Sequence, residues 1–326
     1  MCKISQNMNY INPICISELN IYDIFHNDNN EVVIIMPYIQ TPYTIKYKTN
    51  HNNNLIFNLN KCPHNHTYIY TLSISYNKKI QLIIDNIEIE TFVNKYSSFK
   101  DEIILSTIVK NEDNFIVSWI NFHLNIGITR FIIYDNSINS TLSNILDKFI
   151  KEQIVVLIRW NYPYINNISG ISGQTTQQNH SIYTFTNSKY IGLFDIDEYI
   201  NMQGETNIHS FFENLIVKEN ININTIGSFR LLNKFFYNPD NIVIDNNNFL
   251  QIFNCDIITE YGHEKNFVLP KNVITFSVHM ITYGKPMYTI NKKYAYFNHY
   301  YYLNKANRGN NKTDLIDNTI LLHLPN

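Results

Sequence analysis

The chain has few of the residues that mark specialised architectures. Its cysteines are Cys2, Cys15, Cys62 and Cys255. They are too scattered for a zinc site and too few for a small disulfide-stabilised secreted domain. The polar start, residues 1–10, contains no apolar stretch of signal-peptide or membrane-span length. We therefore expect reduced thiols, no transmembrane segment and a cytoplasmic location.

Charge is also sparse. Charged residues make up 16% of the 326-residue chain, and the formal net charge is only −2. A balance this close to zero provides no strong field to attract nucleic acid or an anionic membrane. We therefore expect no nucleic-acid partner. Hydrophobic residues make up 44% of the chain, which is enough for a large core in one large domain or two.

Glycine and proline are scarce, with nine of each, whereas Asn, Ile and Tyr are used heavily. This bias is typical of an AT-rich genome, so runs of Asn are weak evidence for function. The runs within residues 27–30, 52–54 and 246–248 are most simply interpreted as loops.

Residues 1–97 have a β-rich pattern. Runs of β-branched and aromatic residues alternate there with Asn-rich turns. The predicted strands cover residues 31–38, 43–47, 55–59, 67–76 and 79–89. None of these runs carries a clustered chemical motif. We predict a smaller accessory β domain over residues 1–97, with a sandwich as the candidate architecture.

Beyond residue 97 the pattern changes to alternating strands and helices. Predicted strands cover residues 103–109, 130–134, 154–160 and 190–195, and predicted helices cover 112–125, 142–151 and 174–188. Such alternation builds a parallel sheet with helices on its faces. Ligands bind beyond the carboxyl ends of the strands in sheets of this kind. We predict an α/β domain over residues 98–326, with a binding site at that rim.

The segment YIGLFDIDEYI, residues 190–200, carries the most specific chemistry. An apolar run leads to Asp195 and Asp197, and Glu198 follows directly. Residues i and i+2 of a strand point to the same face, so the two aspartates can converge on one point. Converging carboxylates suit Mn²⁺ or Mg²⁺, which take remaining ligands from water and substrate phosphates. The segment predicts a metal–diphosphate site.

Four ordered blocks resemble glycosyltransferase family 92 and its family 2-like relatives of the GT-A type. The blocks are VKNEDNFIVSWINFHLNIGITRFIIYDNS at 109–137, FDIDEY at 194–199, KNFVLP at 265–270 followed by His279, and NHY at 298–300 followed by Lys305, Arg308 and Lys312. The resemblance covers about residues 100–313. One departure is Leu269, which stands where the family has Arg before the proline.

The resemblance implies a GT-A fold, Rossmann-like, with a mostly parallel sheet and helices on both faces. It also implies a hexosyltransferase that uses a UDP-sugar donor, with galactose favoured, and a glycan, glycoprotein or other hydroxyl acceptor. The metal would be held by Asp195 and Asp197, with either His279 or His299 as a further ligand. The reaction would be inverting, and Glu260 or Glu264 would deprotonate the acceptor hydroxyl.

The resemblance further implies a set of donor-binding residues. They are Lys110, Asn111, Glu112, Asp135, Gln174, Gln178, Asp195, Lys265, Lys305, Arg308 and Lys312. Structural alternatives are a helix N-cap at Asn111 and an Asp-Asn turn at Asp135. The basic residues at 305–312 suggest a lid that closes on diphosphate, with a solvated surface turn as the alternative.

Two other functional classes stay open. The loss of Arg at position 269 motivates a degenerate protein that binds a nucleotide sugar or glycan without turnover. Paired acids also suit a metal-dependent phosphohydrolase or nucleotidyltransferase. An unanchored transferase with this composition suggests a bacterial, protist or large-DNA-virus source, with the host cytoplasm as the location if viral.

Overall fold

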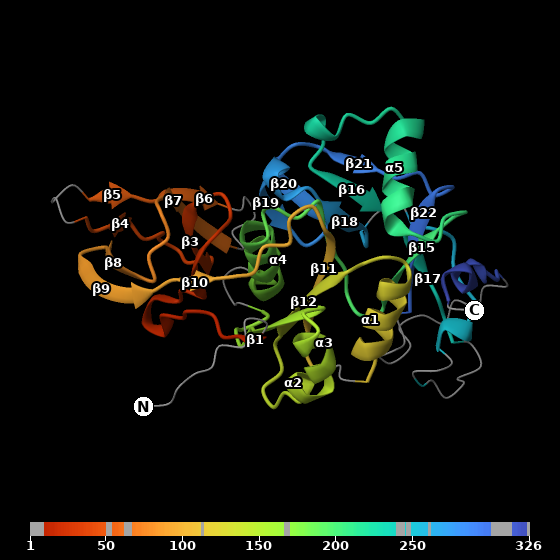
Figure 1. The fold of residues 1–326 in the computed structure, drawn as a ribbon, viewed down its shortest axis with the longest axis horizontal. Helices are drawn as coiled ribbons and strands as arrows, with labels where there is room; N and C mark the ends of the chain where they lie inside the picture. The colour runs from red at the N-terminus through yellow and green to blue at the C-terminus, as the bar shows by residue number, and fades with distance from the viewer. Residues whose placement is uncertain are drawn as a thin grey trace.

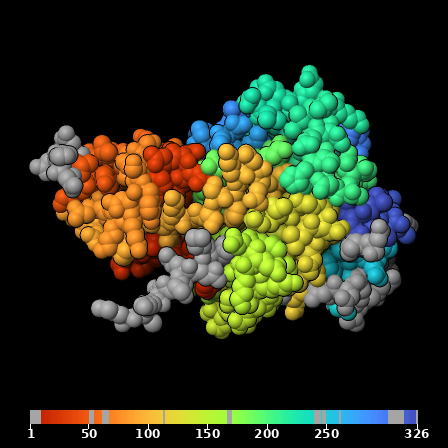
Figure 2. All heavy atoms as spheres, viewed as in Figure 1, coloured from red at the N-terminus to blue at the C-terminus, as the bar shows by residue number. Residues whose placement is uncertain are grey.

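The structure is a computed structural model. It describes residues 10–49, 54–61, 67–111, 114–165, 170–238, 245, 249–259, 262–300 and 315–324. A β-rich N-terminal part, coloured red to orange, lies beside a larger α/β part (Figure 1). In the space-filling view, red N-terminal atoms lie against the blue atoms of the β19–β20 region (Figure 2). The two parts therefore meet directly.

The N-terminal part contains two antiparallel sheets and one parallel pairing. Their strands are β2 (Asp23–His26), β3 (Glu31–Pro37), β4 (Ile45–Tyr47), β5 (Leu55–Ile56), β6 (Asn58–Lys61), β7 (Thr67–Ser73), β8 (Lys79–Ile84), β9 (Ile87–Phe92) and β10 (Asn94–Lys95). The orders are β10-β2-β3-β7-β6 and β5-β4-β8-β9, with β10 parallel to β2. One hydrophobic cluster includes buried residues of both sheets, so they form a sandwich.

Strand β3 is apolar on both faces because both faces are covered. Ile34 and Met36 belong to the cluster between the two N-terminal sheets. Val33 and Ile35 belong to a second cluster, which also contains residues of the α/β sheet and of helix α4. A strand buried on both sides has a continuous hydrophobic run in place of alternation.

The α/β part is organised on an eight-stranded sheet of order β1-β13-β12-β11-β14-β18-β16-β21. Its strands are β1 (Tyr10–Ile11), β11 (Ile103–Val109), β12 (Arg130–Asp135), β13 (Val155–Arg159), β14 (Tyr190–Leu193), β16 (Ser228–Leu231), β18 (Lys265–Val268) and β21 (Met287–Thr289). The first five strands in this order are parallel, and β18 is antiparallel to both of its neighbours.

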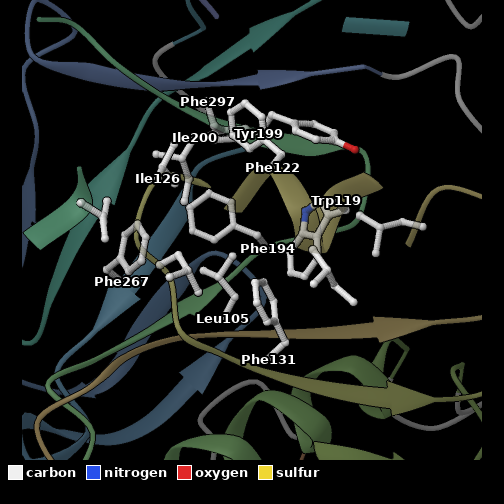
Figure 3. Packing of buried hydrophobic residues seen from close by; sticks show 14 of the residues in the cluster. Leu105, Trp119, Phe122, Ile126, Phe131, Phe194, Tyr199, Ile200, Phe267 and Phe297 are labelled. Atoms are coloured by element: carbon white, nitrogen blue, oxygen red, sulfur yellow. The ribbon is translucent and has the colours of Figure 1, made fainter. Parts of the chain in front are cut away.

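Helices cover both faces of this sheet. They are α1 (Ile116–Asn125), α2 (Leu142–Ile145), α3 (Asp147–Lys151), α4 (Ser172–Thr184) and α5 (Ile208–Lys218). Four of them, α1, α2, α3 and α5, contribute to a cluster on one face (Figure 3). In that cluster the rings of Trp119 and Phe131 are 5.4 Å apart. Helix α4 packs on the other face, between the sheet and the N-terminal sandwich (Figure 1).

The remaining strands form two small sheets. They are β15 (Glu198–Met202), β17 (Asn233–Phe235), β19 (Val273–Ser277), β20 (Met280–Gly284) and β22 (Ala295–His299). Strands β19 and β20 form a hairpin, and β15, β22 and β17 form a sheet in that order. Of the described residues, no helix is both long and apolar enough to cross a bilayer.

Most predicted strands of the α/β part are present within two residues of their predicted ends. The predicted strand at 103–109 is β11 itself, whereas β14 ends at Leu193 and not at residue 195. The mixed α/β class and the helices on both faces are confirmed. The assignment to the GT-A type and the boundary at residue 97 stay predictions. Strand β1 joins the α/β sheet, so the earliest described residues belong to that sheet.

A buried polar network joins the two parts. The carboxylate of Asp23 on β2 accepts hydrogen bonds from Tyr96, from Asn94 at 2.9 Å and from Nε2 of His180 at 2.9 Å. His180 lies on α4, and its Nδ1 is 2.7 Å from the Tyr134 hydroxyl of β12. Asp23 and His180 are both fully buried. A buried carboxylate needs such donors, because desolvation without partners is costly.

We predict that Asp23→Ala lowers the free energy of unfolding by about 3–5 kcal/mol, because buried donors on both parts lose their acceptor. Urea denaturation at neutral pH measures the change. The matched control is Asp28→Ala in the exposed β2–β3 turn, where we expect a change within about 0.5 kcal/mol. Equal effects of the two substitutions would contradict a joining role for the network.

Candidate functional site

The carboxyl ends of the central parallel strands meet at one rim. The register places Val109 of β11 opposite Asp135 of β12, and Ser106 of β11 opposite Leu193 of β14. The segments that follow these strands therefore project from the same edge of the sheet. This is the edge at which α/β proteins bind ligands.

The two aspartates of the DID segment do not lie on a strand. After β14 ends at Leu193, the chain turns and β15 begins at Glu198. The Glu198 side chain accepts a hydrogen bond from the backbone N–H of Asp195 at 2.9 Å, and this bond holds the turn. The expectation that Asp195 and Asp197 share one strand face was wrong, because the turn gives each aspartate its own partner.

Asp197 faces a histidine that is distant in the sequence. Strand β15 pairs with β22 in a register that places Glu198 opposite His299. His299 Nε2 is 3.5 Å from an oxygen of Asp197, and its Nδ1 is 3.8 Å from an oxygen of Glu198. All three residues are buried. Trp119 of α1 fixes this strand further, because its indole N–H donates to the carbonyl of Glu198 at 3.0 Å.

Asp195 pairs with a lysine. Lys265, the first residue of β18, places its Nζ 2.6 Å from Asp195 and 3.2 Å from Glu198. Lys265 is 2% exposed, so its charge depends on these carboxylates. Burial opposes the charge, but the two acids outweigh burial and raise the pKa of Lys265. Strand β18 brings the lysine here because it runs antiparallel to β14, the strand that ends beside Asp195.

Burial also controls the other titratable groups. It raises the pKa of Glu198 to about 7, although Lys265 acts in the opposite direction. Burial opposes the charge of His299 as well, but Asp197 and Glu198 outweigh it, so the pKa of His299 is raised. The site thus holds a proton and several charges in a poorly hydrated volume.

Three residues of the described part could together hold a metal ion. One candidate ligand atom each from Asp197, Glu198 and His299 lies within 4.8 Å of the others. Carboxylate oxygens with one imidazole suit Mn²⁺, and the oxygens suit Mg²⁺. Asp195, which was predicted as a ligand, is outside this group and bonded to Lys265. The structure therefore fits a divalent cation with Glu198 in the position predicted for Asp195.

A small cleft adjoins the cluster on the side of α4. Its walls include Ser106 and Thr107 of β11, the α4 glutamines, Asp195 and Lys265. Gln177 donates to Ser106 at 2.9 Å, and Gln178 donates to the Val278 carbonyl at 3.1 Å. Among the described residues, Thr107 Oγ1 and Gln178 Oε1 have no hydrogen-bond partner. The Thr107 hydroxyl can donate or accept a hydrogen bond, whereas the Gln178 oxygen can only accept one.

Gln174, the other predicted glutamine, also lines the cleft. It accepts a hydrogen bond from the Tyr164 hydroxyl at 2.8 Å. Helix α4 is polar in composition, yet nearly all of its residues are buried. Polar side chains on a buried helix need hydrogen-bond partners. Several of these side chains line the cleft, and His180 belongs to the Asp23 network.

His279, a predicted metal ligand, and Glu264, a predicted base, each have partners of their own. The Nδ1 of His279 donates to the carbonyl of Glu264 at 2.7 Å, and His279 is outside the group formed by Asp197, Glu198 and His299. The Glu264 carboxylate accepts from the N–H of Gly262 at 3.1 Å and lies 3.6 Å from Arg230. Glu264 is adjacent in sequence to Lys265 and is buried.

The other donor-binding predictions fall into two groups. Asp135 is buried at the end of β12, where it accepts from Arg159 at 2.7 Å and from the N–H of Ser137 at 3.0 Å. Asn111 has a positive φ of 55°, its N–H donates to Ser137, and Lys110 beside it is exposed. The remaining predictions lie outside the described residues. They are Glu112, Glu260, Lys305, Arg308 and Lys312.

The Leu269 departure is distant from the acids. Lys265 begins β18, and Leu269 follows its other end, about 13 Å away at the usual rise of a strand. The Leu269 side chain is buried in the hydrophobic cluster under α1. Lys271, two residues further along the chain, lies at the same far end. The departure therefore removes no group from the Asp197 cluster.

The sequence pattern assigned the metal to Asp195 and Asp197 and left Glu198 without a role, and it did not indicate Gln177. Glu198 begins a strand and is one of the three grouped ligands. The usable signal was a third acid directly after Asp197. Gln177 could not be identified from the sequence because both sides of α4 are buried. The spacing of polar residues along one face of the helix therefore does not show which of them face the site.

Comparisons with known proteins place this site in a family. Residues 104–325 match the model of glycosyltransferase family 92. A glycosyltransferase family 92 protein of Arabidopsis thaliana is 31% identical over 107 residues, 32% of this chain and 17% of that protein. A glycosyltransferase family 92 protein of Oryza sativa subsp. japonica is 24% identical over 115 residues, which are 35% of this chain and 19% of that protein. A family 92 protein of Ricinus communis is 25% identical over 124 residues, which are 35% of this chain and 20% of that protein. The chain spans about a fifth of the length of these curated relatives.

Two solved structures are distantly similar. S. aureus TarS matches 61% of this chain and 36% of its own, with 12% identity and a TM-score of 0.38. HddC from Yersinia pseudotuberculosis matches 60% of this chain and 92% of its own, with 13% identity and a TM-score of 0.33. Likenesses at these TM-scores carry no argument about the fold or the function.

We predict that Glu198 makes the metal-free protein less stable as the pH rises from 5 to 6. Its pKa is about 7 in the folded chain and 4.5 in the unfolded chain, so unfolding releases a proton in this range. The Glu198 contribution to the free energy of unfolding should then fall by about 1.2 kcal/mol between pH 5 and pH 6. The buried His123, whose pKa is lowered to about 3 by burial, adds a slope of the opposite sign, so the Glu198 contribution is the difference between wild type and a variant without this acid.

Urea denaturation at pH 5.0 and 6.0 with EDTA measures this slope. Relative to wild type, Glu198→Gln should raise the change in the free energy of unfolding between pH 5.0 and 6.0 by about 1.2 kcal/mol, whereas the exposed control Glu213→Gln should leave that change as it is in wild type. A slope that is the same in wild type and Glu198→Gln would contradict a protonated Glu198 in the folded chain.

Proposed function

The chain belongs to glycosyltransferase family 92, and we propose that it is a metal-dependent hexosyltransferase. It transfers a hexose, with galactose favoured, from a UDP-sugar to a hydroxyl group of a glycan or glycoprotein, with inversion. Family membership supports a glycosyltransferase with a nucleotide-sugar donor and a glycan acceptor. Metal dependence, the donor, the stereochemistry and the GT-A type of its fold are parts of the proposal.

The observation that carries the proposal is the group formed by Asp197, Glu198 and His299 at the strand rim. Two carboxylates and an imidazole within 4.8 Å form a donor set that suits Mn²⁺ or Mg²⁺. A cation bound by these residues would neutralise the departing diphosphate, as metal ions do in phosphate chemistry. Lys265 adds a fixed positive charge at the same place.

The polar side chains beside this group are the proposed contacts of the donor sugar; the cleft they line has a volume of about 10 Å³, so it must widen to admit one. Gln174, Gln178 and Thr107 line it, and carboxamide and hydroxyl groups bond well to sugar hydroxyls. Asp135, with Asn111 at the neighbouring strand end, is the proposed contact for the uridine. Because Arg159 already bonds one oxygen of Asp135, the other oxygen and its Ser137 partner would face the nucleotide.

A carboxylate should remove the acceptor proton in an inverting displacement. Glu264 is the proposed base among the described residues, because it lies beside Lys265 and its oxygens are oriented by Gly262 and Arg230. Glu260 remains a proposal outside the described residues. The proposed location is the cytoplasm, or the host cytoplasm if the source is viral.

The alternative of a degenerate binding protein has lost its motivating observation. It depended on Leu269, which lies at the end of β18 remote from Lys265 and packs in the core. The grouped acids, the lysine and the histidine remain in place without an arginine at that position. A catalytic transferase is therefore the proposal that the geometry supports best.

We predict that Asp197→Ala removes Mn²⁺-dependent binding of the donor. Isothermal titration with UDP-galactose and UDP-glucose, with and without Mn²⁺, should show at least a tenfold weaker affinity in the variant. Transfer to a hydroxyl acceptor should fall by about 10²–10³-fold, typical of losing a charge-stabilising group. The control is Asp147→Ala on α3, an exposed aspartate paired with Lys151.

The same titrations discriminate the other classes. Hydrolysis of the UDP-sugar at an equal rate without acceptor would favour the phosphohydrolase. Binding without turnover across acceptors would favour the degenerate protein. If no nucleotide sugar bound to the wild type with or without Mn²⁺, the proposed donor site would be wrong.

A further inference from the structure

A second cleft lies where the N-terminal sandwich meets the α/β part. It has a volume of about 290 Å³, at the lower limit of ordinary ligand pockets. Its walls come from β3, β6 and β7 of the sandwich, the C-terminal half of α4 and the segment that leads into β19. Lys265 is at the start of β18, and that segment follows the other end of the same strand. The cleft therefore lies away from the proposed catalytic rim.

The walls carry polar groups that the fold leaves unused. Of the residues that the structure describes, Lys271 has no ion-pair or hydrogen-bond partner, although it lines the cleft. Thr186 is buried and its Oγ1 is unpartnered. Glu31 uses one carboxylate oxygen to accept from Asn27 at 3.0 Å, which leaves the other available. Thr186 is the buried member of this set, and a buried hydroxyl requires a partner such as water or a ligand.

The cleft is also held in a fixed shape. The Tyr183 hydroxyl accepts from Asn60 of β6 at 3.3 Å and donates to the Ile274 carbonyl at 2.8 Å. It therefore bonds the sandwich to α4 and α4 to β19 across the cleft. Ile182 and Val273 add apolar surface to the same walls. A preformed site costs less conformational entropy on binding than a flexible one.

The charges in the walls decide the class of ligand. Glu31 and Lys271 contribute one charge of each sign, so the cleft has no excess positive charge for a phosphate or nucleotide. Carboxylate, ammonium, amide and hydroxyl groups beside an aromatic ring and aliphatic side chains match a ligand with many hydroxyls and an apolar ring face. We propose that this cleft binds a neutral saccharide unit, at a site separate from the catalytic rim.

Helix α4 connects the two sites. Gln174 lines the cleft at the rim, and Tyr183 lines the second cleft. Gln174 and Tyr183 are nine positions apart, which corresponds to about 14 Å along a helix, a span of a few sugar units. An extended glycan bound at the second cleft could thus approach the rim. This use rests on the proposed function, whereas saccharide binding in the second cleft does not.

The test uses the full chain and saturation-transfer NMR, followed by titration. The probes are the methyl β-glycosides of galactose, glucose, mannose and N-acetylglucosamine, together with lactose, cellobiose and chitobiose. The variant is Glu31→Gln combined with Lys271→Met, which removes both charges with little change of volume. The matched control is Lys148→Met, an exposed lysine on α3. Thermal unfolding verifies that each variant is folded.

We expect at least one saccharide to bind the wild type and to bind the double variant at least fivefold more weakly. Lys148→Met and Asp197→Ala should leave that affinity unchanged. Equal binding by the double variant, loss of binding in Asp197→Ala, or no saccharide binding at all would overturn the proposal. Failure of UDP-sugar binding with saccharide binding intact would refute the proposed function alone.

Discussion

The burial of charged groups at the rim is the constraint on which the site depends. Lys265, Glu198 and His299 are almost removed from water, and an ion without partners in such a place is very costly. Lys265 and His299 therefore each require a carboxylate at short distance. That requirement is met only when β18 runs antiparallel to β14 and β22 pairs with β15 in the observed register. The same contacts that stabilise these charges hold Asp197 beside His299.

Helix α4 relates this site to the rest of the molecule. One part of it borders the rim through Gln177 and Gln178, and His180 bonds to Asp23 of the sandwich. Its C-terminal half, with Tyr183, borders the second cleft. A polar helix is tolerated between two sheets because its side chains bond to residues on both sides. The accessory part is consequently packed into a hydrophobic core that it shares with the α/β sheet.

Much of the fold could be predicted because its strands and helices are locally encoded. The apolar run of β11, the helical spacing of α1 and the four-strand alternation each need only neighbouring residues. Short pieces were missed, such as β2 and β10, because four residues or fewer give little periodic signal. At the site, Asp197, His299 and Lys265 were predicted from the resemblance. Glu198 was underrated, since its contacts come from residues 67 and 101 positions later in the chain.

By itself, the sequence determined the α/β class and the strand rim as the place of the acids. It also gave the DID segment and a late histidine as candidate metal ligands. Only the tertiary structure decided which acid faces which partner. Asp195 bonds to Lys265, whereas Asp197 and Glu198 approach His299. The reason is physical: local pattern records which residues are buried or exposed, but strand register and the turn after β14 decide the distances between charges. Those distances exist only once segments remote in the sequence are packed together.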